Sequence, residues 1–244
     1  MFNVFKKFFN IIFPSTCHVC KEVIHCPGVC DECWKGLVFI TNPKCKLCGF
    51  PFEFYDVESN INTDLVCLRC LKDKPDFDRA VAVLKYNDAA KKIVLPFKHS
   101  DRTNLRYFIS DLMVATISSE NDILDDLDFI IPVPLHFKRL LKRKYNQAAL
   151  LATCISQKVS APYLNALRRI RFSESQGHLS LKKRRENIKN CFDIRLQCVK
   201  KIINKNILLI DDVMTTGATV NECAKMLKKA GAKKVYVLSF CKVY

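Results

Sequence analysis

Apolar stretches alternate with polar, lysine-rich segments along the last two thirds of this chain. Four of the stretches have the length of buried strands, at residues 80–86, 129–133, 207–210 and 234–241. Three longer runs repeat their apolar positions with the period of a helix, at residues 89–98, 104–118 and 220–230. Gly231 follows the last run and ends that helix. Strands that alternate with helices predict an α/β fold, with a parallel sheet flanked by helices.

The first 16 residues have a pattern of their own. One face of a helix there is apolar and is formed by Phe2, Phe5, Phe9, Ile12 and Phe13. This face is expected to pack on the rest of the protein, and the alternative is a helix that lies on the inner membrane surface. The segment lacks the basic start and cleavage site of a secretory signal, and no run approaches the ~20 apolar residues of a membrane span. We therefore expect a cytoplasmic protein without a transmembrane segment.

Eight of the 14 cysteines form four pairs with the spacing C-x-x-C: Cys17 and Cys20, Cys30 and Cys33, Cys45 and Cys48, and Cys67 and Cys70. Two thiolates at this spacing suit one tetrahedral ion, and the 18-residue gap before Cys67 is typical of a zinc ribbon. Residues 17–75 are therefore predicted to form a small zinc-ribbon module in a reducing compartment. Four thiolates leave no open position for a reacting water, so the Zn²⁺ is expected to be structural.

The pairing of these cysteines is open from the sequence. We prefer sequential quartets, which would hold two zinc ions, and the alternatives are interleaved pairing or a single occupied site. His18, His25 and Cys26 are spare donors, which we interpret as bystanders. Gly49 directly follows Cys48 and permits the positive φ that such metal-binding turns need. Because the module has little apolar core, it is expected to unfold without metal.

The stretch ILLIDDVMTTGAT, residues 207–219, contains the strongest candidate site. Asp211 and Asp212 follow an apolar strand at the edge where open α/β sheets bind ligands. The small residues after them open a helix, whose backbone amides form a cradle for phosphate. Because carboxylates do not favour phosphate, this pair must face hydroxyl groups or a metal ion. A phosphorylated sugar satisfies both halves of the arrangement.

This stretch resembles the signature of type I phosphoribosyltransferases, which bind 5-phosphoribosyl-1-pyrophosphate (PRPP) together with Mg²⁺. The resemblance implies that Asp211 and Asp212 contact the ribose hydroxyls and carry any catalytic role. It also implies a phosphate-binding loop formed by Met214, Thr215, Thr216, Gly217, Ala218 and Thr219. The fold expected for residues 76–244 is a type I phosphoribosyltransferase-like domain.

The chain resembles the competence protein F-like group in four features: the string PVPL, the basic run after it, the string RKYNQ and the cysteine module. That group more often has Arg-Gly-Phe-Asn-Gln, so Lys144 stands here in place of the glycine. The resemblance places pyrophosphate after Ile131 and implies a flexible lid at residues 168–192. The residues expected to contact pyrophosphate or a nucleic-acid phosphate are Lys138, Arg139, Arg143, Arg184 and Asn187.

The net charge of +16 is concentrated in one segment. Residues 135–190 contain 14 Lys or Arg against two acidic residues, and this density suggests a polyanionic partner. Four aromatic residues within or beside the basic segment are candidate platforms for base stacking: Phe137, Tyr145, Phe172 and Phe192.

Two functions follow from these patterns. The resemblance to the competence group implies a PRPP-binding protein that handles single-stranded DNA in the cytosol during DNA uptake, with uptake proteins at the inner membrane as possible partners. The alternative is an active phosphoribosyltransferase that transfers ribose 5-phosphate from PRPP to an acceptor. No residue in the sequence identifies that acceptor.

Overall fold

The computed structural model describes residues 15–52, 65–99, 102–171 and 186–244. The amphipathic helix expected at residues 1–16 lies almost wholly outside this part of the chain. Among the described residues, no helix has the length and apolar character that crossing a bilayer requires.

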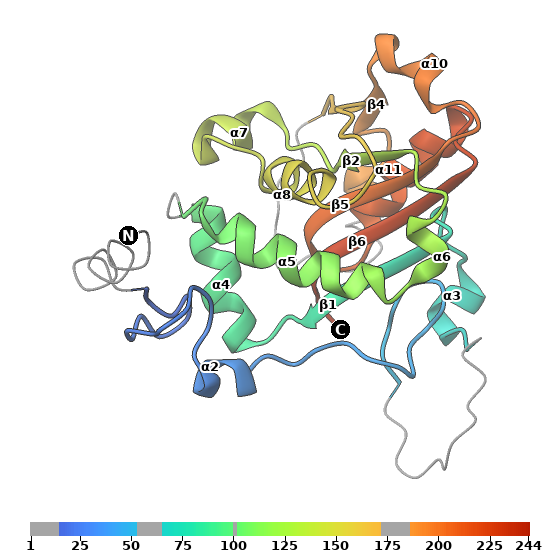
Figure 1. Cartoon of the computed structure of the whole chain (residues 1–244). Coiled ribbons are helices and arrows are strands. Elements are labelled where there is room, and N and C mark those ends of the chain that lie inside the picture. Colours follow the sequence, from blue (N-terminus) through green and yellow to red (C-terminus); the bar gives the residue numbers. More distant parts are fainter. Residues whose placement is uncertain (1–14, 53–64, 100–101, 172–185) are drawn as a thin grey trace.

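A parallel sheet forms the centre of the molecule (Figure 1). Its four strands are β1 (Arg79–Lys85), β2 (Phe129–Pro132), β5 (Asn206–Met214) and β6 (Lys234–Lys242). They lie in the order β1-β6-β5-β2, and each neighbouring pair is parallel. Because the strands are parallel, their carboxyl ends meet at the same edge of the sheet. This edge carries the predicted ribose and phosphate residues.

Helices cover both faces of the sheet. One face packs against α4 (Asp88–His99), α5 (Leu105–Ser118), α6 (Asn121–Leu124) and α8 (Gln147–Ser156). The other face packs against α11 (Ala218–Lys229). Strand β5 shows how the sequence serves both layers: Leu208 and Ile210 point to the first core, whereas Ile207 and Leu209 point to the second.

A second, antiparallel sheet consists of β3 (Leu167–Arg169) and β4 (Phe192–Ile194). It is followed by a 3-10 turn, η1 (Leu196–Cys198), and the short helix α10 (Val199–Ile202). Leu167 and Phe192 are 1% and 2% exposed. The two strands that bound the segment interpreted as a lid therefore each place a side chain in the core, and residues between these strands are the candidates for a lid. Of these, residues 172–185 lie outside the described part.

A helix that the sequence did not indicate, α7 (Phe137–Arg143), forms from the basic run after β2. His136 caps it through Nδ1, which accepts a hydrogen bond from the amide of Lys138 at 3.2 Å. Lys144 ends it with φ +66°, a left-handed conformation that glycine adopts more easily. The lysine in place of the family's glycine therefore keeps the backbone geometry of a helix stop.

The cysteine-rich segment contains α2 (Asp31–Lys35) and α3 (Leu68–Lys72) and runs beside β1 (Figure 1). The amide of Ile40 donates to the carbonyl of Val83 at 2.9 Å, and the amide of Ala80 donates to the carbonyl of Leu47 at 2.8 Å. Glu120, which is 8% exposed, pairs with Lys44 at 2.5 Å and also with Arg79. Backbone and charge contacts thus attach the segment to the edge of the sheet.

Candidate functional site

Strand β5 carries both predicted ribose carboxylates within its length. The apolar pattern ended the strand at Ile210, but pairing with β6 continues from Asp211 opposite Ser239 to Met214 opposite Lys242. The prediction was four residues short, because polar side chains do not prevent backbone pairing when the neighbouring strand extends as far. The regular backbone fixes where the carboxylates leave the strand.

The phosphate loop joins β5 to α11. Gly217 has φ +76° and precedes the first residue of α11, so the chain turns sharply into the helix. A Cβ at this position would meet only the sulfur of Met214, at 3.9 Å. The glycine is therefore required for its backbone angle and not for space. Thr216 Oγ1 accepts a hydrogen bond from the amide of Ala218 at 3.3 Å. Amides at the start of this 12-residue helix attract anions.

Charge at the carboxylate pair is balanced from a helix that is distant in sequence. Burial raises the pKa of Asp211 well above its ordinary value, and the neighbouring carboxylate of Asp212 adds to this effect. Lys98, in the last turn of α4, opposes it, and its Nζ lies 3.1 Å from Asp212 Oδ2. Both side chains are more than 80% buried, at 17% and 14% exposure. Sequence reasoning missed Lys98, because nothing local marks it.

Basic side chains gather around α7. Arg139 is half-buried, and burial lowers its pKa, with Arg169 and Arg143 adding repulsion. Arg169 on β3 was not among the predicted residues, although it belongs to this cluster. Arg143 Nη1 donates to Gln147 Oε1 at 3.2 Å, and its charge acts on His99 together with Lys98. The end of α4, α7 and β3 therefore bring positive charge to one region.

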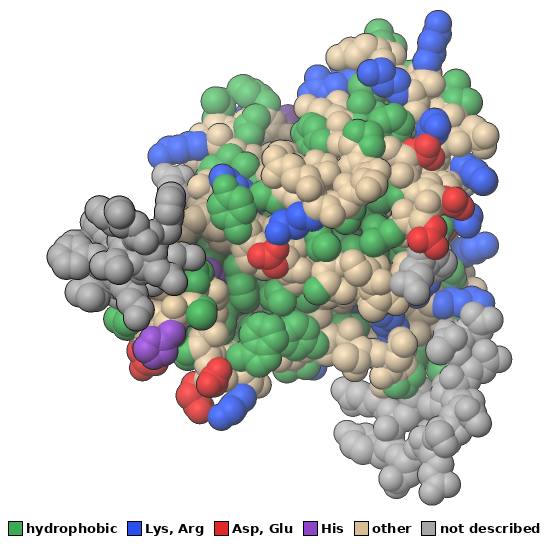
Figure 2. Space-filling view, in the orientation of Figure 1, with side chains coloured by type: hydrophobic (Ala, Val, Ile, Leu, Met, Phe, Trp, Pro, Cys, Tyr) green, Lys and Arg blue, Asp and Glu red, His purple; other side chains and the backbone are tan. Residues whose placement is uncertain are grey.

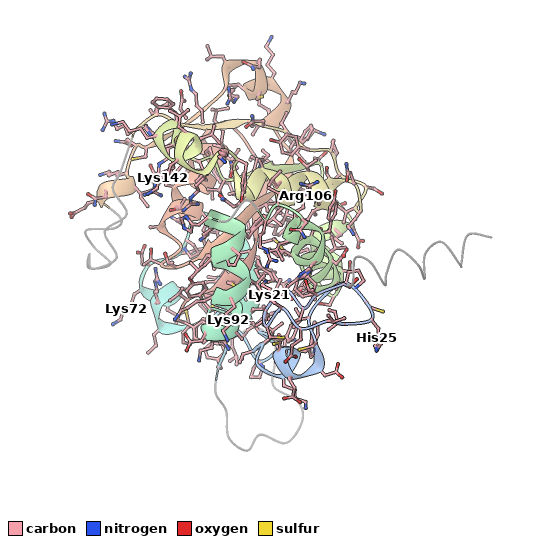
Figure 3. All side chains as sticks on the ribbon, turned by 90° about the vertical axis from the view of Figure 1, so that its left-hand side faces the viewer. Lys21, His25, Lys72, Lys92, Arg106 and Lys142 are labelled. Atoms are coloured by element: carbon pink, nitrogen blue, oxygen red, sulfur yellow. The ribbon has the colours of Figure 1, made fainter. Side chains whose placement is uncertain are left out.

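The structure says less about the other three predicted phosphate contacts, Lys138, Asn187 and Arg184. Lys138 is exposed on α7, and Lys142 on the same helix points outward in Figure 3. Asn187 is exposed, and its carbonyl accepts a hydrogen bond from the thiol of Cys191 at 3.2 Å. Arg184 lies outside the described residues. The roles of Lys138, Asn187 and Arg184 therefore stay predictions.

The predicted stacking aromatics separate into different environments. Phe137 is 61% exposed. Tyr145 donates its hydroxyl to the carbonyl of Phe97 at 2.8 Å. Phe192 is 2% exposed, and the Arg169 guanidinium lies 5.3 Å from the centre of the Phe192 ring. The prediction that Phe192 offers a free face to a base was therefore wrong. Phe172 lies outside the described residues.

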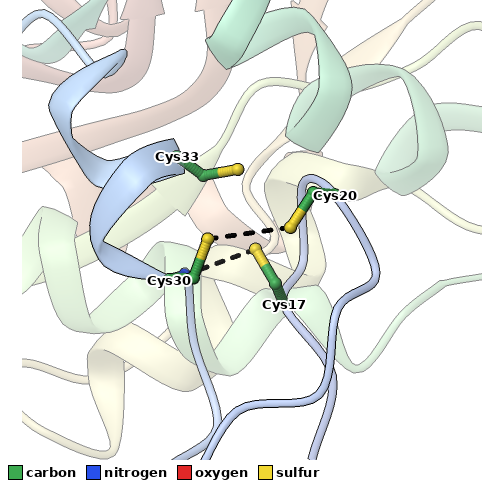
Figure 4. A group of neighbouring side chains, drawn as sticks. All are labelled: Cys17, Cys20, Cys30 and Cys33. Carbon is green, nitrogen blue, oxygen red and sulfur yellow. Dashed lines mark hydrogen bonds between the residues drawn. The ribbon is translucent and has the colours of Figure 1, made fainter.

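The cysteines form two quartets, in the sequential arrangement that we preferred. Within each quartet all sulfurs lie within 4.8 Å of one another: Cys17, Cys20, Cys30 and Cys33, and Cys45, Cys48, Cys67 and Cys70. Figure 4 shows the first group. The Cys20 and Cys30 sulfurs are 3.6 Å apart, and those of Cys48 and Cys67 are 3.7 Å apart. Four sulfurs at the usual Zn–S distance of about 2.3 Å are about 3.8 Å apart, so both groups fit tetrahedral zinc.

Backbone amides prepare one thiol in each quartet for metal binding. Burial raises the pKa of Cys17, but amides that include Cys30, at 3.3 Å from the sulfur, outweigh it and lower the pKa to about 6. Cys45 has the same arrangement with the amide of Cys67 at 3.3 Å, and its pKa falls to about 7. Zinc binds the thiolate form, so these donors favour metal binding near neutral pH.

The second quartet lies next to the phosphate loop. Arg69, between the ligands Cys67 and Cys70, donates to the carbonyl of Thr216. Asp76 and Asn221 exchange two hydrogen bonds of 2.7 Å each. Asn221 belongs to the first turn of α11. The ribbon therefore contacts the loop through Arg69, and Asp76, which directly follows the ribbon, contacts the helix after the loop.

Comparisons with known families divide the chain in two. Residues 8–71 match the double zinc ribbon domain, and residues 146–243 match the phosphoribosyl transferase domain. These matches, with the parallel sheet and the two quartets, confirm the predicted fold class. They also support structural zinc in the amino-terminal segment.

Relatives that match most of the chain are named for competence or for DNA utilization. The chain is 30% identical to competence protein F of Haemophilus influenzae over 236 residues, 95% of this chain and 96% of the relative. It is 28% identical to the DNA utilization protein YhgH of Escherichia coli K12, with 94% and 97% covered. Competence protein ComFC of Bacillus subtilis is 32% identical over 87% of this chain and 82% of its own length. This chain belongs to the competence protein F family.

Proposed function

We propose that the protein binds PRPP with Mg²⁺ and handles single-stranded DNA in the cytosol during DNA uptake. The observation that carries the first half is the arrangement around β5. A largely buried carboxylate pair is followed directly by a phosphate loop, and cationic side chains gather at α7, β3 and the end of α4, as a sugar with phosphate at both ends requires. The match of residues 146–243 to the phosphoribosyl transferase domain supports this proposal.

Each part of PRPP has a partner in the proposed complex. Amides of residues 215–219 hold the 5′-phosphate at the start of α11. Asp211 and Asp212 accept hydrogen bonds from the ribose hydroxyls, and their oxygen atoms suit Mg²⁺. When bound, Mg²⁺ neutralises charge on pyrophosphate. Arg139 and Arg143 contact the pyrophosphate end, where repulsion between the arginines falls once an anion lies between them. A catalytic role for the carboxylates stays a prediction.

The second half of the proposal rests on names and charge. One relative is named a competence protein and another a DNA utilization protein. Residues 135–190 have a net charge of +12. Figure 2 shows further Lys and Arg side chains along the edge of the face that carries α10. Phosphates of a single strand are attracted by this charge, and the exposed ring of Phe137 offers a face to a base.

The proposed compartment is the cytosol, with proteins of the uptake machinery at the inner membrane as partners. None of the 14 cysteines, all of which lie in the described part of the chain, is in a disulfide, and a reducing compartment keeps cysteines in this state. Eight of them form the zinc quartets.

Two titrations test the proposal. Calorimetry with PRPP and Mg²⁺ is expected to show binding by the wild-type protein and loss of binding after Asp211→Ala with Asp212→Ala. Anisotropy of a labelled single strand is expected to show binding whose logarithm falls linearly with the logarithm of salt, by about 0.7 for each phosphate neutralised. Arg143→Glu lowers both affinities.

Lys92→Glu is the matched control for Arg143→Glu. Lys92 is exposed on α4, well separated from Lys142 of α7 in Figure 3. This charge reversal is expected to change PRPP affinity less than twofold. Absence of PRPP binding by the wild-type protein contradicts the first half of the proposal. DNA binding that does not respond to salt contradicts the second half.

A further inference from the structure

A cavity of about 690 Å³ lies between the second zinc ribbon, the phosphate loop and the carboxyl terminus. Its volume is within the range of about 300–1,000 Å³ that small-molecule sites have. The loop contributes Met214, Thr216, Gly217 and Ala218 to its wall. Asp211, Asp212 and Lys98 are not among its described lining residues. The cavity therefore shares the phosphate loop with the proposed PRPP site, whereas the carboxylate pair and Lys98 do not belong to its described wall.

Aromatic rings form one part of the wall. Phe50 and Tyr244 are 38% and 41% exposed, and their ring centres are 5.5 Å apart in an edge-to-face arrangement. Phe52 meets Phe50 in the same way at 6.2 Å. Phe77, which is 5% exposed, lies beneath the surface of the wall. Exposed rings held in place by one another lose little entropy when a flat ligand stacks on them.

The charges of the wall favour a neutral ligand over phosphate. Five cationic side chains line the cavity: Arg69, Lys74, Lys189, Lys225 and Lys242. Three acidic side chains oppose them: Asp73, Glu186 and Glu222. Three of the four ligands of the second quartet also line the cavity, and four thiolates around one Zn²⁺ carry a charge of about −2. Positive and negative charges then balance, so the cavity does not concentrate anions.

Although its charges balance, the cavity is lined by side chains that can form hydrogen bonds, among them Lys242 and Glu222. Lys242 is 6% exposed, and its ammonium interacts electrostatically with the sulfurs of Cys48, Cys67 and Cys70 in the cavity wall. An ammonium has three donors, so it can also donate to a ligand in the cavity, and the carbonyl groups on the edge of a nucleobase supply an acceptor. Glu222 accepts from the amide of Asn190 at 2.9 Å, which holds this carboxylate in position on the opposite wall.

From these walls we propose that the cavity binds a nucleobase of single-stranded DNA, stacked on Phe50 and Tyr244 beside Lys242. The proposal rests on the DNA-handling function proposed above and assigns a place to the base. The sugar-phosphate backbone stays outside, on the basic surface. A base has the three properties that the walls require: a flat aromatic face, no charge and carbonyl acceptors at its edge. Free nucleosides share this chemistry, and the test separates the two sources.

The test uses the full-length, zinc-loaded protein with two 12-nucleotide strands. One is oligothymidine with a central 2-aminopurine, and the other has an abasic backbone of the same length. The wild-type protein is expected to bind the base-bearing strand about tenfold or more tightly than the abasic strand and to quench the 2-aminopurine fluorescence. Phe50→Ala and Tyr244→Ala are expected to remove the quenching and to reduce the preference to less than threefold. Both variants should retain PRPP affinity.

Tyr107→Ala is the matched control, since Tyr107 is 53% exposed on α5 and does not line the cavity. It should leave preference and quenching unchanged. If both cavity variants keep the preference and the quenching, the base site is wrong while DNA handling stands. If the wild-type protein binds neither strand, the proposed DNA-handling function is contradicted, and the base site with it. If thymidine at the same concentration displaces the strand's base equally well, the cavity is a site for small molecules and the strand assignment is overturned.

Discussion

The guanidinium of Arg69 donates a hydrogen bond to the backbone carbonyl of Thr216, across 147 positions of sequence. Arg69 lies between two cysteines of the second quartet, and Thr216 lies in the phosphate loop. The contact therefore connects metal binding with the shape of the loop. A carbonyl held away from the phosphate leaves the amides of the loop free to face it.

Arg69→Ala is expected to weaken PRPP binding by about three- to tenfold, since a charge-assisted hydrogen bond at an exposed position contributes roughly 1 kcal/mol. Calorimetry at fixed Mg²⁺ measures the effect. Lys72→Ala removes one positive charge from the same helix, and Lys72 is exposed on α3 (Figure 3). Equal losses in the two variants would indicate an effect of net charge and contradict a specific role for Arg69.

Lys98 and Asp212 form a buried ion pair whose disruption should be measurable. Lys98→Met is expected to destabilise the protein by roughly 2–3 kcal/mol, because a carboxylate with 14% exposure then lacks its counter-charge. Lys98→Met combined with Asp212→Asn should recover about 1–2 kcal/mol of this loss. Urea unfolding measures both, with Lys92→Met on the exposed face of α4 as the control. Additive losses in the double variant would show that the two residues are not coupled.

Short-range patterns in the sequence were sufficient for the four strands of the central sheet, for the helices α4, α5 and α11, and for the metal ligands. The run 207–210 is apolar because β5 is covered on both faces, and that coverage is visible in its composition. The C-x-x-C spacing identified each half of a metal site, and Gly49 has the positive φ, +67°, that was predicted for it. These features depend on neighbours within a few residues.

The site residues that escaped prediction depend on tertiary contacts. Lys98 lies in the last turn of an ordinary amphipathic helix, and only the packing of α4 on the sheet brings it to Asp212. Arg169 lies between Arg168 and Arg171 in the sequence, and burial distinguishes it from them only after β3 has formed. The role of Arg69 could not be predicted for the same reason, because its partner, Thr216, is 147 positions away in the sequence. Long-range contacts of this kind leave no periodic trace in the sequence.

Asp211 should reduce stability at neutral pH. Burial and Asp212 raise its folded-state pKa above the unfolded value, so between the two values the native state retains a proton that the unfolded state releases. The free energy of unfolding therefore falls as pH rises through this window. Asp211→Asn is expected to raise Tm by a few degrees at pH 8, and the gain should shrink toward pH 5, as the wild-type carboxyl becomes protonated.

Thermal unfolding of both proteins from pH 8 to pH 5 measures this difference. Asp88→Asn is the control, because Lys91 lowers the pKa of this exposed carboxyl. It should give no gain at any pH. A gain for Asp211→Asn that is constant over the range would contradict titration of this group as the cause.

Zinc content should follow the two quartets independently. The purified protein is expected to release two zinc ions per chain to a chelator, and Cys17→Ser and Cys67→Ser should each release one. Because Arg69, between two ligands of the second quartet, contacts the phosphate loop, Cys67→Ser should lower PRPP affinity, whereas Cys17→Ser should not. A colorimetric zinc assay and calorimetry provide the two measurements. Equal effects of both variants on PRPP binding would contradict the connection through Arg69.

Gly49 should tolerate no side chain, for two separate reasons. Its φ of +67° disfavours other residues, and an added Cβ would lie 2.7 Å from the backbone carbonyl oxygen of Ala80 in β1. Gly49→Ala is expected to destabilise the protein by about 3 kcal/mol and to lower zinc content to about one ion. Gly28→Ala separates the reasons, because Gly28 also has positive φ, +150°, but its Cβ would meet only Phe108, at 3.9 Å. Urea unfolding should show a smaller loss for Gly28→Ala, and equal losses would mean that the contact with β1 contributes nothing.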